Sequence, residues 1–311
     1  INYLTMNTDV LKGKFDMRSK SINVNDFMAY NSDVLGSSAS GSSSGVVLIP
    51  DNLDVEIKGF VNQVAYDNIY LKNFKSNMKI KSGQLILDNT GFELAGLKSD
   101  MNIRYRSLNT HKARFDFTVK ADSFDIQRAY KEIPLFQEMI TSAKNAHGIV
   151  SLDYQLAGLL DEEMSPIMRS ITGKGSLTLE QIKFLNFKLL NGISKETGKE
   201  GFLKSDVNKV RINTSIANNV MTIERTKMKM AGFRPRVEGQ VTLDGRMNLG
   251  FRLGLPPWGI FGIPMQITGT ADKYKIKLGK YKEDDLDEDM DEEDKALFEA
   301  SLASDSTQTV Q

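Results

Sequence analysis

Strict alternation of apolar and polar residues dominates this chain and constrains its fold more than any other feature. Leu53, Val55 and Ile57 alternate with charged residues, and the same period recurs over about 101–106, 115–119, 150–156 and 247–253. Successive side chains of a β-strand point to opposite faces, so this period predicts strands with one buried and one wet face. We therefore expect a mainly β protein whose strands are long and half-buried.

Short turn signals separate these runs. They are Lys81-Ser82-Gly83, the segment 88–91, Asn218-Asn219 and Asp244-Gly245. An Asp-Gly pair between alternating runs favours a tight hairpin. Frequent hairpins predict a curled antiparallel sheet, which would form either an open groove or a barrel-like meander.

Only two segments show helical periodicity. Apolar residues recur at helical spacing over 125–144, where Pro134 predicts a break or kink. The second segment covers 186–196, with Gly198 as its expected stop. The first helix would either connect strands or plug a groove.

Composition divides the chain into four parts. Residues 1–35 read as the end of a preceding β repeat, and 36–45 as a flexible Gly/Ser linker. Residues 46–280 form the expected β-groove domain, and 281–311 an acidic, disordered tail. Because the chain starts inside a strand-like pattern, we expect any export signal or anchor to lie upstream.

Charge is distributed unevenly although the net charge is zero. The body before the tail has 38 basic and 28 acidic residues, whereas the tail has 2 and 12. A basic body suits an anionic membrane surface, and an ordinary solvated face is the alternative. Basic residues alternate with acids instead of clustering, which argues against nucleic-acid binding.

The residues that catalysis or metal binding requires are sparse. The chain has no cysteine, and its two histidines, His111 and His147, stand apart. The Gly173-Lys174-Gly175 stretch leads into a strand and lacks the helix amides that a phosphate loop needs. The acidic run after Glu283 lacks the turn glycine of a calcium-binding loop. We expect a non-enzymatic protein without a cofactor or metal, and with no catalytic residue.

The long apolar face must be covered by something. A packed sandwich core would cover it, with methionine as filler at Met78, Met228, Met230 and Met247; a groove for an apolar ligand is the alternative. The predicted inward residues are Leu53, Val55, Ile57, Phe92, Leu94, Met101, Ile103, Phe115, Phe117, Leu152, Tyr154, Leu249 and Phe251.

The only tryptophan lies in an apolar, proline-rich segment, 255–264. This segment would either cap the sheet or dip into a membrane interface with Trp258, Ile260 and Phe261. It is shorter than the roughly 20 residues of a spanning helix.

Three stretches resemble the C-terminal region of the AsmA family. Residues 171–179, followed by 187–194, are similar to its G-x-G-x-L-x-L strand and short Leu-rich helix. Residues 46–55 resemble its I-P-x-N-L-D entry, and 262–270 its closing I-P-x-x-x-x-G-T strand. Tyr274 stands near the position where the family usually has a proline.

The resemblance implies a function that periodicity alone does not. Family members are periplasmic, anchored to the inner membrane by an upstream helix, and linked to outer-membrane biogenesis. Larger relatives are regarded as bridge-like phospholipid carriers with an apolar β-groove. The implied function is binding or transfer of phospholipid between the two membranes. The alternative is a structural or chaperone-like factor in outer-membrane protein assembly and targeting.

Overall fold

The computed structural model describes residues 10–24, 26, 45–66, 69–94, 96–132, 146–184, 188–199, 207–230, 232–256, 258–270 and 273–279. The Gly/Ser linker up to residue 44, Pro134 and the acidic tail lie outside these ranges, so the predictions made for them stay predictions.

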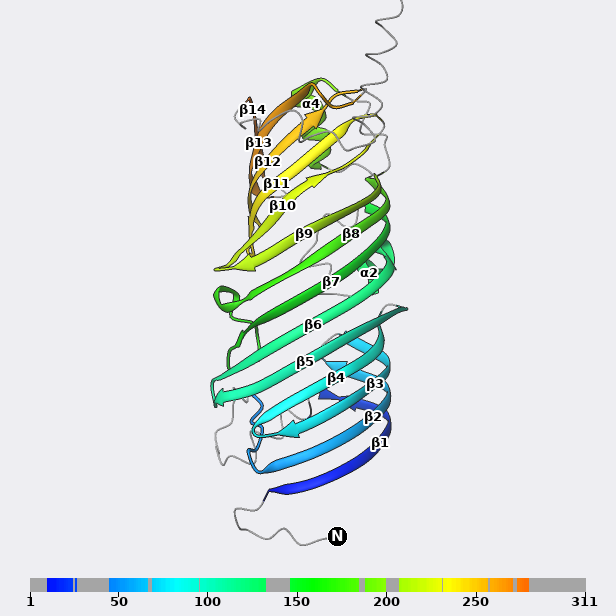
Figure 1. Ribbon diagram of the computed structural model, residues 1–311, viewed down its shortest axis with the longest axis vertical. Helices are drawn as coiled ribbons and strands as arrows, with labels where there is room; N and C mark the ends of the chain where they lie inside the picture. Colours follow the sequence, from blue (N-terminus) through cyan, green and yellow to red (C-terminus); the bar gives the residue numbers. More distant parts are fainter. Residues whose placement is uncertain are drawn as a thin grey trace, which may run out of the picture. The chain divides into compact units, whose positions relative to one another are not determined.

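Fourteen strands account for most of the described chain and are hydrogen-bonded in sequence order (Figure 1). They are β1 Leu11–Asn23, β2 Leu53–Tyr66, β3 Ile69–Lys81, β4 Gln84–Leu94, β5 Leu97–Asn109, β6 Lys112–Asp125, β7 Ala146–Leu160, β8 Thr172–Phe184, β9 Val207–Ala217, β10 Val220–Lys227, β11 Arg234–Thr242, β12 Arg246–Gly254, β13 Gly262–Thr270 and β14 Tyr274–Leu278. The expected mainly β class is confirmed, and the described sheet is open, with β1 and β14 at its edges.

The sheet is mixed rather than wholly antiparallel. β1 pairs in parallel with β2, so that Phe15 lies beside Ile57 and Arg18 beside Phe60. A parallel pair needs a long connection, which the residues between Asn23 and Leu53 supply. Alternation does not distinguish the two pairings, because it is the same in both.

The chain divides into two compact units. Unit 1 comprises 1–141, 150–177 and 215–219, and it contains β1–β6 with most of β7. Unit 2 comprises 142–149, 178–214 and 220–311, and it contains β10–β14. β8 and β9 contribute residues to both.

Tight turns connect neighbouring strands as the sequence predicts. Ser82 and Gly83 join β3 to β4 with φ of 48° and 68°, and Asn218 and Asn219 join β9 to β10 with φ of 52° and 66°. Two central residues with positive φ match the right-handed twist of the flanking strands.

The predicted turn at 88–91 is wrong. These residues lie inside β4, where Leu87 pairs with Ile103 but Thr90 with Met101, so that Asp88 and Asn89 together oppose one residue of β5. This is a β-bulge, and Asn89 takes the left-handed conformation, with φ of 49°. Asn tolerates this conformation in bulges as well as in turns, so its presence does not separate the two.

Both predicted helices exist where the structure describes them. α2 (Ile126–Glu132) begins after Asp125, whose side-chain oxygen accepts a hydrogen bond from the Arg128 amide at 2.8 Å. α4 (Lys188–Thr197) ends at Gly198, with φ of 66°. A single 3₁₀ turn, Met168–Ser170, precedes β8.

Unit 2 has its own core beneath α4. Ile193 of the helix is fully buried with Phe233, Leu253, Met265 and Ile267. A Cβ placed on Gly192 would lie 2.6 Å from the Tyr274 hydroxyl oxygen, so the helix packs closely on β14. In this unit a helix covers the apolar face of the strands.

Candidate functional site

Two rows of apolar side chains cross unit 1 from strand to strand. The register joins β2 through β6 residue by residue. One row consists of Val55, Ile80, Leu85, Tyr105 and Phe115, and the next of Ile57, Met78, Leu87, Ile103 and Phe117. We call the surface that carries these rows the apolar face.

Most predicted inward residues of unit 1 belong to this face. Leu53 lies on it beside Val55, and Met101 lies beside Ile103, each two positions along its strand. Phe92 and Leu94 reach it because of the β4 bulge, which turns Thr90 inward opposite Met101. Without the extra residue both side chains would point to the opposite face.

β7 and β8 continue the apolar face. A Cβ on Gly158 would lie 3.0 Å from the Phe115 ring, which places Gly158 and the alternating Tyr154 and Leu152 on that side. A Cβ on Gly175 would lie 2.5 Å from Tyr154 Cγ. The glycines of the Gly173-Lys174-Gly175 stretch therefore lie within β8 under side chains of β7, and they form no phosphate loop.

Two predicted inward residues lie elsewhere. Leu249 and Phe251 belong to the core of unit 2, together with Met247 and the α4 residue Ile193. Met230 of unit 2 is also buried, and Met228 is half-buried.

The described residues cover the apolar face only in part. Val55, Phe92 and Met101 are buried, each with 8% of its surface exposed. The remaining predicted residues of unit 1 stay half-buried: Leu53, Ile57, Leu94, Ile103, Phe115, Phe117, Leu152 and Tyr154. At the centre of the second row Leu87 is itself buried, in a cluster with Val61, Phe74, Phe92 and Met101. The less covered side chains therefore lie on either side of this cluster.

A short segment, residues 45–49, crosses one end of the apolar face, and we call it the strap. Its Gly45 and Val46 amides donate to the carbonyls of Glu162 and Thr110 at 2.9 and 3.0 Å. The Tyr105 hydroxyl donates to the Val47 carbonyl at 2.7 Å. Burial raises the pKa of Tyr105 to about 12. Val46 of the strap packs in one buried cluster with Tyr105 and Ala113 of the sheet.

The tryptophan segment forms the connection between β12 and β13. The buried Arg252 guanidinium donates to the carbonyls of Gly259 and Ile260 at 2.8 Å each. Trp258 and Ile260 are half-buried, whereas Phe261 is 78% exposed. The loop is held from within by Arg252, and of the three candidate membrane-contacting residues Phe261 is the most accessible.

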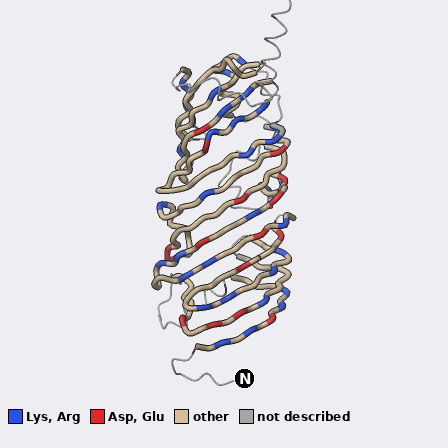
Figure 2. The backbone as a smooth tube through the Cα atoms, viewed as in Figure 1, with Lys and Arg blue, Asp and Glu red and all other residues tan. Residues whose placement is uncertain are grey.

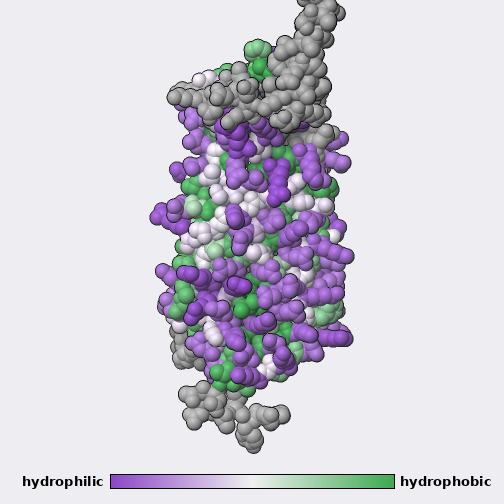
Figure 3. All heavy atoms as spheres, in the orientation of Figure 1, coloured by the Kyte–Doolittle hydropathy of each residue, from purple (hydrophilic) through white to green (hydrophobic). Residues whose placement is uncertain are grey.

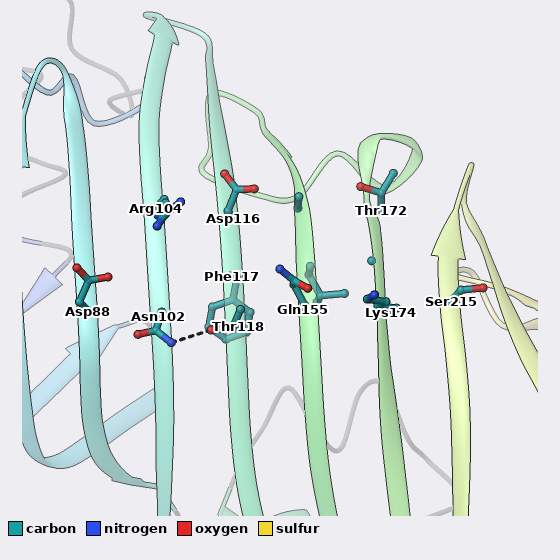
Figure 4. A pocket seen from close by; sticks show the side chains of 13 residues that line it. Asp88, Asn102, Arg104, Asp116, Phe117, Thr118, Gln155, Thr172, Lys174 and Ser215 are labelled. Carbon is teal, nitrogen blue, oxygen red and sulfur yellow. Dashed lines mark hydrogen bonds between the residues drawn. The ribbon is translucent and has the colours of Figure 1, made fainter.

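The face opposite the apolar rows is polar (Figure 3). A hollow of about 710 Å³ lies on it, and Figure 4 shows polar side chains from β4 to β9 around it, among them Asp88, Arg104, Asp116 and Lys174. A second hollow, of about 660 Å³, lies on β1–β4. Sequence reasoning missed both, since each depends on the register of several strands.

The two histidines remain separate. His111 Nδ1 lies 2.9 Å from Glu162 Oε2 at the surface, and His147 is exposed on β7. Within the described ranges, no three His, Asp or Glu side chains gather as a metal site would require. In the same part of the chain, no helix combines the length and apolar character needed to span a bilayer.

No family model, curated protein or solved structure matches this chain. The AsmA resemblance therefore stays a prediction.

Proposed function

We propose that the chain binds acyl chains of phospholipids on the apolar face of unit 1. The observation that carries this proposal is the pair of continuous apolar rows on β2–β6, in which Ile57, Ile103 and Phe117 are only half-buried. Monomeric proteins seldom leave large contiguous apolar patches in water unless something binds there.

The energetics favour a long alkyl chain as the ligand. Each buried CH₂ group contributes about 0.8 kcal/mol, so a chain lying along the rows gains affinity without specific polar contacts. Met78 and Met101 lie in or beside the rows, and their flexible thioethers adapt to varied ligand shapes. The role is non-catalytic: the lipid is held and passed on unchanged.

We further propose, from the AsmA resemblance, that the protein works in the periplasm. There an upstream inner-membrane anchor would hold it while lipid moves between the inner and outer membranes. This transfer would support outer-membrane biogenesis.

Site-specific photocrosslinking tests the binding face. A photoreactive residue at Ile103, on the apolar face, is expected to capture co-purifying phospholipid. The same residue at the adjacent Arg104, on the polar face, serves as the matched control and is expected to capture none. Mass spectrometry identifies the adduct, and equal labelling at the two positions would exclude the apolar face as the lipid site.

A second function, holding outer-membrane protein precursors, is favoured by the edge strand β1. Its outer edge has no partner among the described strands, and Leu11 and Phe15 are 51% and 58% exposed. An open edge accepts an additional strand from another protein. Crosslinking from β1 that captures β-barrel precursors, with no lipid captured at Ile103, would favour this function over lipid transfer.

A further inference from the structure

The polar face of β1–β3 carries an excess of positive charge. These three strands contain nine Lys or Arg residues and three Asp or Glu residues. Figure 2 shows the basic residues distributed along the strands at this end of unit 1. Charge alone is compatible with an ordinary solvated face, so a site requires a more specific arrangement.

That arrangement exists in the hollow on β1–β4. Its lining includes three cations, Arg18, Lys58 and Lys75, and one carboxylate, Asp16. The register places Arg18 and Lys75 on either side of Phe60, on β1, β3 and β2 respectively. Lys75 Nζ lies 5.7 Å from the centre of the Phe60 ring. Phe60 occupies a position of β2 where the alternation predicts a polar residue. Its aromatic ring therefore lies in a basic hollow.

The three cations of this hollow form no ion pair within the described part of the chain. Two other cations of these strands are paired: Lys14 lies 3.0 Å from Glu56 and Lys81 lies 3.3 Å from Asp54. Lys12 and Lys79 resemble the hollow cations in making no ion pair with a described residue, so the hollow differs from them in grouping three such cations around one ring. Asp16 lies beside Lys58 in the register but makes no ion pair with it. The hollow therefore presents a net positive charge that the described residues leave unneutralised.

Two asparagine side chains, one of them from the β4 bulge, line the same hollow. Asn77 of β3 and Asn89, the bulged residue, both line it. The Asn89 backbone N–H donates to Asn102 Oδ1 at 2.8 Å, which fixes the bulge and leaves the side-chain amide of Asn89 as the group that can donate to a ligand. Bulges commonly re-aim side chains beside functional sites. Side-chain amides and three cations can donate hydrogen bonds to the oxygens of a phosphate group, and the aromatic ring can contact the carbon atoms that carry it.

We propose that this hollow binds a phosphate group, carried either by a lipid headgroup or by a soluble phosphate ester. Arg18, Lys58 and Lys75 hold the anion, and Phe60 contacts the carbon atoms attached to it. The site lies on the face opposite the apolar rows, so it does not depend on acyl-chain binding.

Two probes distinguish the sources of the phosphate. Calorimetric titration of the full chain with glycerol 3-phosphate tests a soluble ester, and flotation with phosphatidylglycerol or phosphatidylcholine vesicles tests a headgroup. The double variant Arg18→Gln/Lys75→Gln is expected to weaken binding about 30-fold, since each cation near a phosphate contributes about fivefold. Binding of glycerol 3-phosphate alone identifies a soluble ester, and binding of vesicles alone identifies a headgroup.

The matched control is Lys12→Gln/Lys79→Gln, which removes the same charge from the same two strands outside the hollow. Lys12 is about 20 Å along β1 from Arg18 and Lys79 about 13 Å along β3 from Lys75, at about 3.3 Å per residue. Both distances exceed the screening length of about 8 Å. The control should retain glycerol 3-phosphate binding within about twofold, and it should lose less vesicle binding than the hollow variant.

Equal losses in the two variants would show diffuse attraction to a basic face and overturn the proposal. Absence of binding to both probes by the unaltered chain would do the same. Thermal unfolding confirms that each variant is folded, because all four substituted side chains are exposed.

Discussion

Tyr105 is the residue where the apolar face and the strap meet. Its ring is buried in the sheet, with 7% of the residue exposed, and its hydroxyl donates to the Val47 carbonyl. One side chain thus satisfies a strap carbonyl and takes part in an apolar row. Of the other anchors of the strap, the Gly45 and Val46 amides donate to backbone carbonyls and the Ile49 amide donates to Ser107 Oγ at 3.3 Å. The shorter bond and the burial of Tyr105 make it the stronger of the two side-chain anchors.

Tyr105→Phe is expected to lower the free energy of unfolding by about 1 kcal/mol, the usual net value of such a hydrogen bond. Urea unfolding measures the change. Tyr70→Phe is the control, because Tyr70 is 53% exposed. An equal effect at both positions would show that the bond to Val47 contributes nothing to stability.

The same hydroxyl predicts a pH dependence. Burial raises the pKa of Tyr105 from 10 to about 12, so the folded state holds this proton more tightly than the unfolded state. The contribution of the protonated Tyr105 hydroxyl to the free energy of unfolding is therefore complete below about pH 10 and is lost as the pH rises towards 12. Tyrosinate absorbance should show one tyrosine titrating late, and Tyr105→Phe should remove that step. A late step that survives the substitution would assign it to another tyrosine.

Gly175 tests the packing of β7 on β8. A Cβ there would lie 2.5 Å from both the Asp153 carbonyl oxygen and Tyr154 Cγ. Gly175→Val should therefore destabilise the fold by about 1–3 kcal/mol, as overpacking generally does. Lys174→Val, at the exposed neighbouring position, is the control. Thermal unfolding compares the two, and equal stabilities would mean that Tyr154 moves aside without cost.

At the scale of elements, the β4 bulge explains both what the sequence predicts and what it does not. Alternation assigns Leu53, Ile103 and Phe117 to one face directly, because their strands are regular. Phe92 and Leu94 share that face only because Asn89 adds a residue to β4. The Asp88–Gly91 stretch is equally typical of a turn, so a local pattern cannot choose between turn and bulge; pairing with β5 decides it.

Local sequence patterns also fail to predict the parallel pairing of β1 with β2 and the hollow on β1–β4, for the same reason. Arg18, Phe60 and Lys75 come from three strands, and their proximity depends on register. Helices are simpler, because their periodicity and caps are local, as Asp125 and Gly198 illustrate.

The packing of the helix α4 on the strands of unit 2 can be tested by substitution. Ile193 is fully buried against unit 2 strands, whereas Lys195 on the same helix is exposed. Ile193→Ala is expected to destabilise unit 2 by about 2–5 kcal/mol, and Lys195→Ala by much less. Hydrogen exchange on β12 and β13 measures this locally. Unchanged protection in Ile193→Ala would show that the helix does not stabilise these strands.

At the scale of the whole molecule, the two units treat their apolar faces differently. In unit 2 the helix α4 packs on the face, and the buried residues form a closed core. In unit 1 the strap covers one end and Leu87, Phe92 and Met101 are buried, while Ile57, Ile103 and Phe117 stay half-buried. Sequence alternation is alike in both units, so it could not predict which face is covered. Because no described helix packs on the apolar rows of unit 1 as α4 does in unit 2, unit 1 is the candidate for lipid.

The length of the apolar rows makes the lipid proposal quantitative. From Val55 to Phe115 a row crosses four strand spacings of about 4.8 Å, or roughly 19 Å. One leaflet of a bilayer core is about 15 Å thick, so an acyl chain of ordinary length fits along a row. Affinity for straight-chain fatty acids should then rise about fourfold per CH₂ group, at about 0.8 kcal/mol each. It should level off once the chain exceeds the row.

Displacement of a fluorescent fatty acid measures this series. Phe117→Asn, within a row, should weaken the binding of long chains more than that of short ones. Asp116→Asn, on the adjacent polar position, should leave the series unchanged. A slope that does not depend on chain length, or an equal loss in both variants, would mean that the ligand contacts only its headgroup. In that case the apolar face would have to be covered by protein, as it is in unit 2.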